Sequence, residues 1–184
     1  MSATVDTTTL RQHLGRLDAE LTEPVRLCIY GSAPLMLMGE EGRFSVDLDV
    51  AAPYSQANER VLAAAARSIG FPVNPPEDFS GDHIEWVGPA RLCLAPPRAE
   101  DTVVLWQGSQ LTVFTLPPAD LAASRLIRYD PIDQTDIQFL MTQAGVPYDE
   151  IARAVDRLPP AFRQDALVRE NLANLRRDMQ RWTR

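Results

Sequence analysis

The spacing of hydrophobic positions along the chain predicts a helix first, then short strands, then helices again. Leu10, Leu14, Leu17 and Leu21 follow one another at intervals of four, three and four residues, which is the spacing of one face of an amphipathic helix. Pro24 ends this helix, because proline lacks the N–H that a helix interior requires. The first predicted element is therefore an amphipathic helix that packs its leucine face on a core.

Short apolar or alternating runs between turn residues dominate the middle of the chain, and such runs are typical of strands. The predicted strands cover residues 25–31, 43–50, 83–87, 90–94, 102–106 and 111–114. Two helices are expected between them, a short one over 33–38 and an alanine-rich one over 55–69. Ser55 is the expected N-cap of the alanine-rich helix.

From Pro117 onward the pattern is helical. The predicted helices cover residues 119–129, 133–143 and 148–158, and a last helix begins at about residue 161. This order predicts an α+β fold, with a mixed β-sheet core flanked by helices over residues 1–116 and a helical C-terminal region over residues 117–184 packed on the core. The last helix carries a narrow apolar seam, which packs on the body of the protein or forms a homodimer. The seam consists of Val168, Leu172, Leu175, Met179 and Trp182.

Composition narrows the classes of function. The net charge is −7 and the 18 basic residues are all arginine, so no lysine is available as a base or nucleophile, and broad sequence-independent nucleic-acid binding is disfavoured. No apolar run approaches the roughly 20 residues of a membrane span, and the N-terminus lacks the pattern of a signal peptide. Cys28 and Cys93 lie in apolar runs, which predicts reduced, buried thiols in a cytoplasmic protein.

Candidate chemistry concentrates between Gly31 and Asp49. Side chains two residues apart in a strand share a face about 6–7 Å apart, so Asp47 and Asp49 stand side by side and repel each other unless a cation neutralises them. Mg²⁺ prefers such oxygens and shares its coordination shell with phosphates. Upstream, Gly31 and Ser32 form a turn between a strand and a short helix, where backbone N–H groups can approach phosphate oxygens.

Each half of this pattern has an ordinary structural explanation. An alternating strand with an acidic solvent face looks the same as a metal-binding strand, and most strand-Gly-Ser-helix segments are only turns. The two halves occurring in order, about fifteen residues apart and with Arg43 just before the acidic strand, form a more specific pattern. The combination predicts a site for a metal-bound nucleotide.

Residues 30–50 resemble the signature of the nucleotidyltransferase superfamily, a Gly-Gly or Gly-Ser turn followed by a strand with two metal-binding carboxylates. The Arg-x-Ser-x-Asp-x-Asp form at residues 43–49 is similar to that of AbiEii-like and related bacterial families, which often serve as toxins or in phage defence. The resemblance implies a nucleotidyltransferase-like core. It implies metal ligands at Asp47 and Asp49, and nucleotide-binding residues at Gly31, Ser32 and Arg43.

Residues 116–141 resemble a later motif of these families, in which a proline-led helix with a Lys-Leu pair precedes an acidic Asp-x-x-Asp-Ile helix. Arg125 falls on the lysine position, and Asp133 and Asp136 fall on the acidic pair. The resemblance implies catalytic roles for Arg125 and Asp133. The third carboxylate of the superfamily, from which a base for the attacking hydroxyl would come, stays open between Asp133, Asp136 and Glu85.

Two further positions depart from the family pattern. Tyr30 stands where the first glycine of the turn is expected, and Arg125 cannot release a proton near neutral pH. These departures keep two functions open. The first is Mg²⁺-dependent transfer of a nucleoside monophosphate from an NTP to a hydroxyl of RNA or protein, with tRNA or a cognate antitoxin protein as the partner. The alternative is a catalytically degenerate module that binds a nucleotide or a partner.

Overall fold

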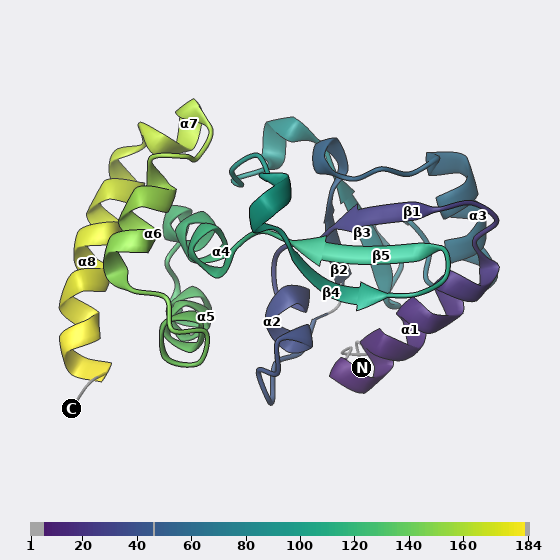
Figure 1. The fold of residues 1–184 in the computed structure, drawn as a ribbon, viewed down its shortest axis with the longest axis horizontal. Coiled ribbons are helices and arrows are strands. Elements are labelled where there is room, and N and C mark those ends of the chain that lie inside the picture. Colours follow the sequence, from purple (N-terminus) through teal and green to yellow (C-terminus); the bar gives the residue numbers. More distant parts are fainter. Residues whose placement is uncertain (1–5, 46, 183–184) are drawn as a thin grey trace. The chain divides into compact units, whose positions relative to one another are not determined.

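The computed structural model describes residues 6–45 and 47–182 of the chain (Figure 1). Contacts between residues divide the chain into two compact units. Unit 1 contains the described residues up to Leu92 together with Thr102–Thr115, and unit 2 contains Cys93–Asp101 together with the described residues from Leu116 onward. Strands occur with helices in unit 1 and helices make up most of unit 2, so the predicted α+β class is confirmed.

Unit 1 is built on five short strands in two groups. The strands are β1 (Val25–Cys28), β2 (Asp47–Ala51), β3 (His83–Val87), β4 (Val103–Gln107) and β5 (Leu111–Thr115). In one group the order is β1-β5-β4, with β5 parallel to β1 and antiparallel to β4. In the other, β2 and β3 are parallel, and a bridge between Ile29 and Val50 connects the two groups. The strand directions are therefore mixed, as predicted.

Three α-helices complete unit 1, namely α1 (Thr7–Glu20), α2 (Ala33–Leu37) and α3 (Glu59–Ser68). A short 3₁₀ turn, η1 (Ala52–Tyr54), follows β2. The side chain of Asp6 accepts a hydrogen bond from the Thr9 N–H and caps α1, as expected of an aspartate at this position. The leucine face predicted from the spacing is buried in the core.

The predicted N-cap of α3 is wrong. Asn58, and not Ser55, accepts the hydrogen bond from the first turn of the helix, at Arg60. The Ser55 hydroxyl instead donates to the carbonyl of Ala51 and accepts from the N–H of Cys28. These two hydrogen bonds connect the end of β2 to β1. Ser55 cannot cap α3, because the helix begins only at Glu59.

Two strand predictions also differ from the structure. The strand expected over 43–50 is confirmed from Asp47, and Val46 lies outside the described residues. The strand expected over 90–94 is replaced by a 3₁₀ turn, η2 (Pro89–Arg91). The N–H groups of Arg91 and Leu92 bond to carbonyls of the same turn, so they are not available to a neighbouring strand.

Unit 2 is helical, as predicted. Its elements are η3 (Ala99–Asp101), α4 (Pro118–Ser124), η4 (Arg125–Ile127), α5 (Pro131–Thr142), α6 (Tyr148–Val155), α7 (Pro160–Arg163) and α8 (Ala166–Trp182). The helix predicted over 119–129 tightens into η4 and ends at Ile127, two residues before Tyr129, whose φ is +53°. The last predicted helix is divided into α7 and α8, and the Asp165 side chain accepts from the N–H of Leu167 at the start of α8.

The apolar seam of α8 is used within the chain. Val168, Leu172 and Leu175 are buried, and α8 contacts α5, α6, α7 and η4. Packing in unit 2 therefore accounts for these three residues, and a homodimer through α8 stays a prediction. In the part of the chain that the structure describes, no helix has both the length and the apolar character of a membrane span.

Both cysteines are free thiols. Cys28 is buried as predicted, whereas Cys93 is only partly buried because the strand expected around it does not form. Burial raises the pKa of each thiol to about 12, so neither is a reactive thiolate near neutral pH.

Candidate functional site

The pairing of β2 with β3 places a third acid beside the two predicted ones. Alternation along β2 buries Leu48 and Val50 completely and leaves Asp47 and Asp49 half-buried on the opposite face. In the parallel register, Asp49 lies directly across from Glu85 of β3. A side chain that is distant in sequence therefore joins the aspartates on the same face of the sheet.

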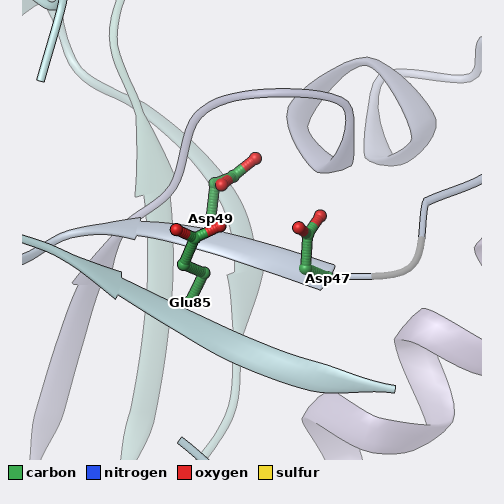
Figure 2. Close-up of side chains that lie close together, drawn as sticks. All are labelled: Asp47, Asp49 and Glu85. Atoms are coloured by element: carbon green, nitrogen blue, oxygen red, sulfur yellow. The ribbon is translucent and has the colours of Figure 1, made fainter. Parts of the chain in front are cut away.

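Asp47, Asp49 and Glu85 form the acidic cluster (Figure 2). One carboxylate oxygen from each lies within 4.8 Å of the others. Around an octahedral Mg²⁺, neighbouring oxygens lie about 3.0 Å apart and opposite ones about 4.2 Å apart. The carboxylates would therefore turn toward one another to bind one ion together. The donors are all hard oxygens, and half-burial leaves access for substrate phosphates. The residues present thus fit a magnesium ion.

Gly31 allows Asp49 to occupy this position. Its φ of +69° lies in the left-handed region that glycine adopts readily. A Cβ at Gly31 would collide with Oδ2 of Asp49 and lie 3.1 Å from its Cγ. A backbone hydrogen bond also joins the two segments, since the Tyr30 N–H donates to the carbonyl of Asp49 at 3.1 Å. The predicted turn and the predicted acidic strand are therefore packed directly against each other.

The polar residues around the turn are linked to one another. Nη2 of Arg43 donates to the Ser32 hydroxyl at 2.8 Å, and the Ser45 hydroxyl donates to Oδ1 of Asp47 at 3.1 Å. The structure thus brings together Gly31, Ser32 and Arg43, which the sequence predicted for phosphate binding. The helix after the turn, α2, has five residues, so its dipole adds little, and its Pro34 offers no N–H.

Tyr30, the departure from the expected glycine, lies beside the acidic cluster. Burial raises the pKa of its phenol above the ordinary value, and the negative charges of Asp49 and Glu85 raise it further. The phenol therefore keeps its proton at neutral pH and is available as a hydrogen-bond donor. The ring that replaces the glycine supplies a polar group to the site.

Glu85 has an arginine partner. Nη2 of Arg91, in η2, lies 2.7 Å from Oε1 of Glu85, and the side chains are 75% and 27% exposed, respectively. Arg91 is not among the residues that the sequence predicts for the site, because the apolar run around it predicts a strand and the structure has a turn there. Ser45 is the serine of the Arg-x-Ser-x-Asp-x-Asp motif, and the sequence predicts no role for it. Its position two residues before Asp47 indicates that its hydroxyl can reach the Asp47 carboxylate.

The other candidates belong to unit 2. Nε of Arg125 lies 2.9 Å from Oδ2 of Asp136, with only 6% and 3% of the side chains exposed. Arg128 makes two hydrogen bonds to Asp133, at 2.8 and 2.9 Å. Glu85 is therefore the acid that joins Asp47 and Asp49 within unit 1, whereas arginines of unit 2 bind Asp133 and Asp136. The catalytic roles of Arg125 and Asp133 stay predictions.

A family model described as "nucleotidyltransferase of unknown function (DUF6036)" matches residues 8–151. The chain belongs to this family. The matched region includes the acidic cluster, the Gly31 turn and the segment with Arg125 and Asp133. No curated protein and no solved structure matches the chain. The predicted membership of the nucleotidyltransferase superfamily is confirmed, and the narrower likeness to AbiEii-like families stays a prediction.

Proposed function

We propose that this nucleotidyltransferase moves a nucleoside monophosphate from an NTP to an acceptor hydroxyl and depends on Mg²⁺ held by Asp47, Asp49 and Glu85. The convergence of these three carboxylates from two paired strands carries the proposal. Like charges so close are unfavourable without a cation. The family supports nucleotidyl transfer as the general reaction.

The turn before β2 supplies the phosphate contacts in this proposal. The Gly31 backbone and the Ser32 hydroxyl face the β- and γ-phosphates, and the guanidinium of Arg43, already bonded to Ser32, neutralises part of their charge. Bound Mg²⁺ would supply neutralisation of the phosphate charge that develops in the transition state. Ser45 orients the Asp47 carboxylate by its hydrogen bond.

The reaction forms a bond between the acceptor oxygen and the α-phosphorus and breaks the bond between that phosphorus and the bridging oxygen, so pyrophosphate leaves. A carboxylate of the acidic cluster takes the proton of the attacking hydroxyl. Asp49 and Glu85 lie across from each other in the strand register, which supports either of them as this base. Following the family resemblance, the acceptor belongs to tRNA or to a cognate antitoxin protein, in a toxin–antitoxin or defence setting.

Binding without turnover is the second candidate. The observation that favours it is the ion pair between Arg91 and Glu85, because the guanidinium occupies a carboxylate oxygen that a metal ion would otherwise use. Tyr30 adds bulk beside the same carboxylates. In this case the protein would bind a nucleotide or a partner and transfer nothing.

Calorimetry with each of the four NTPs, with and without Mg²⁺, tests the site. We expect Mg²⁺-dependent binding that the Asp47→Asn/Asp49→Asn variant loses. Glu77→Gln/Asp78→Asn is the matched control, because it removes two charges from an exposed loop of unit 1. Absence of NTP binding by the wild type, or equal binding by both variants, would refute the proposed site.

A labelling experiment separates transfer from binding. Radioactive label in the α-phosphate of the NTP should appear on RNA or protein in a Mg²⁺-dependent way and should be absent with the double aspartate variant. Binding in calorimetry with no labelled acceptor in a cell extract would favour the second candidate.

A further inference from the structure

Arg91 stands at the edge of the acidic cluster in an exposed ion pair. Its side chain is 75% exposed, and Nη2 lies 2.7 Å from Oε1 of Glu85. Exposed ion pairs contribute only about 0–1 kcal/mol. The contact is therefore short enough to hold the guanidinium at the cluster and weak enough to be exchanged for a better partner.

The place of Arg91 in the chain suits such an exchange. Residues 89–91 form the 3₁₀ turn directly after β3, so the backbone is fixed by the strand that carries Glu85. The exposed side chain is long and can reach other acceptors while its backbone stays in place. The positive charge of Arg91 also acts on Tyr30. It lowers the pKa of the phenol, whereas burial and the charges of Asp49 and Glu85 raise it.

One oxygen of Glu85 cannot serve fully both as acceptor for a guanidinium and as ligand for a metal ion. A bare divalent cation at Glu85 competes with Arg91 for the charge of the carboxylate and lies close to the positive guanidinium, which is unfavourable. A metal–NTP complex instead brings phosphate oxygens, which accept bidentate hydrogen bonds from arginine. The nucleotide therefore offers Arg91 a new partner at the moment when Glu85 is needed.

We propose that Arg91 is an exchangeable counter-ion that pairs with Glu85 in the metal-free protein and transfers to the triphosphate when a metal–NTP complex binds. This inference rests on the proposed function. Its consequence is selectivity: Arg91 weakens binding of the metal alone and strengthens binding of the metal with its nucleotide. The two ligands thus bind with positive coupling, and the cluster takes up a metal ion together with substrate.

The test measures two affinities in Arg91→Gln, with Mn²⁺ as the probe because it takes the same oxygen ligands as Mg²⁺. Free Mn²⁺ is followed by electron paramagnetic resonance, first alone and then with α,β-methylene analogues of the four NTPs, in which the bond to be broken is stable. We expect Arg91→Gln to bind Mn²⁺ alone about three- to fivefold more tightly, and the Mn²⁺–nucleotide complex about tenfold more weakly.

Two further variants complete the test. Arg91→Lys keeps the charge, so its Mn²⁺ affinity should return toward the wild-type value, while loss of the bidentate geometry should leave nucleotide binding weaker. Arg169→Gln breaks an exposed ion pair with Asp156 in unit 2 and removes the same charge, so both affinities should match the wild type.

Opposite changes in the two affinities of Arg91→Gln support the exchange. Unchanged affinities, or a parallel loss of both, would overturn it, because a merely structural role moves both in the same direction. Those two results leave the proposed function standing if the wild type binds the Mn²⁺–nucleotide complex. Wild type that binds neither Mn²⁺ nor the complex would overturn both proposals. Arg91→Lys gives the deciding result if Arg91→Gln does not fold.

Discussion

The two units differ in what surrounds their buried or half-buried carboxylates. In unit 2, each of three deeply buried aspartates faces an arginine: Asp136 faces Arg125, Asp133 faces Arg128 and Asp120 faces Arg157. In unit 1, the three acids of the acidic cluster face one another within 4.8 Å, with the exposed Arg91 at Glu85.

This difference separates carboxylates that are paired with arginines from carboxylates that are gathered beside one another. A buried carboxylate that is paired with an arginine has its charge balanced within the fold, and removing one partner leaves an uncompensated charge. Carboxylates gathered against one another favour a cation from outside. We therefore expect an added divalent cation to stabilise unit 1, and we expect no such effect from the paired aspartates of unit 2.

The largest expected effect comes from breaking a pair in unit 2. Arg125→Met leaves the buried Asp136 without its cation, so we expect the free energy of unfolding to fall by about 3–5 kcal/mol, measured by urea denaturation. The double variant Arg125→Met/Asp136→Leu should recover most of the loss, because it removes both charges. A single variant as stable as the wild type would contradict the structural role assigned to the pair.

A smaller effect is expected where the turn and the acidic cluster meet in unit 1. Gly31→Ala strains the backbone at φ +69° and drives a Cβ into the Asp49 carboxylate, so we expect a loss of about 1–3 kcal/mol of stability. Metal–NTP affinity should fall more than tenfold, because Asp49 is displaced. Calorimetry and thermal melting check the two results.

Gly70→Ala is the control for this substitution. Gly70 has a φ of +75°, and a Cβ added there would meet no other atom within 4 Å, so it suffers the strain without the collision. Stability should fall in both variants, and nucleotide binding only in Gly31→Ala. Equal binding by the two variants would show that the contact with Asp49 does not matter.

Within the described residues, Asp18 of unit 1 has no arginine partner and does not belong to the acidic cluster, and backbone N–H groups bond to its carboxylate instead. It accepts bonds from Ser109, Gln110 and Leu111 at 2.7–3.0 Å. Burial raises the pKa of Asp18, but these hydrogen bonds outweigh burial and lower it below its ordinary value of 3.8. The ionised form therefore stabilises the fold above that value, and the contribution is lost as the pH falls through the lower folded-state pKa.

We expect Asp18→Asn to lower stability at pH 7 by about 1–2 kcal/mol and to flatten the loss of stability between pH 5 and about pH 3. Urea denaturation at a series of pH values measures both. If Asp18→Asn loses as much stability at low pH as the wild type does, other carboxylates cause that loss.

The smallest effect has the opposite sign. Asp47→Asn/Asp49→Asn removes repulsion within the acidic cluster, so the metal-free protein should become more stable by about 0.5–1 kcal/mol, as measured by thermal melting. Asp136→Asn in unit 2 should destabilise, because Arg125 loses its counter-charge. Destabilisation in both variants would mean that the cluster is satisfied within the fold in the same way as the pairs of unit 2.

Most elements of the fold could be predicted because they depend on local patterns. The leucine spacing placed α1, and alternation placed the buried face of β2. The predictions failed where a residue with a clear local preference was used by a distant one. Ser55 bonds to β1 and not to its helix. Arg91 and Leu92 use their N–H groups within a turn, although the side chains of Leu92 and Leu94 are buried as a strand would bury them.

The sequence by itself determined that a glycine turn and two aspartates on one strand face belong together, because i and i+2 positions and a turn glycine are properties of the local chain. The tertiary structure decided that Glu85 lies beside these aspartates and that Arg91 pairs with Glu85. Glu85 reaches Asp49 only through the parallel register of β2 and β3. Pairing between strands that are distant in the chain depends on how the whole core packs, and no local pattern encodes it.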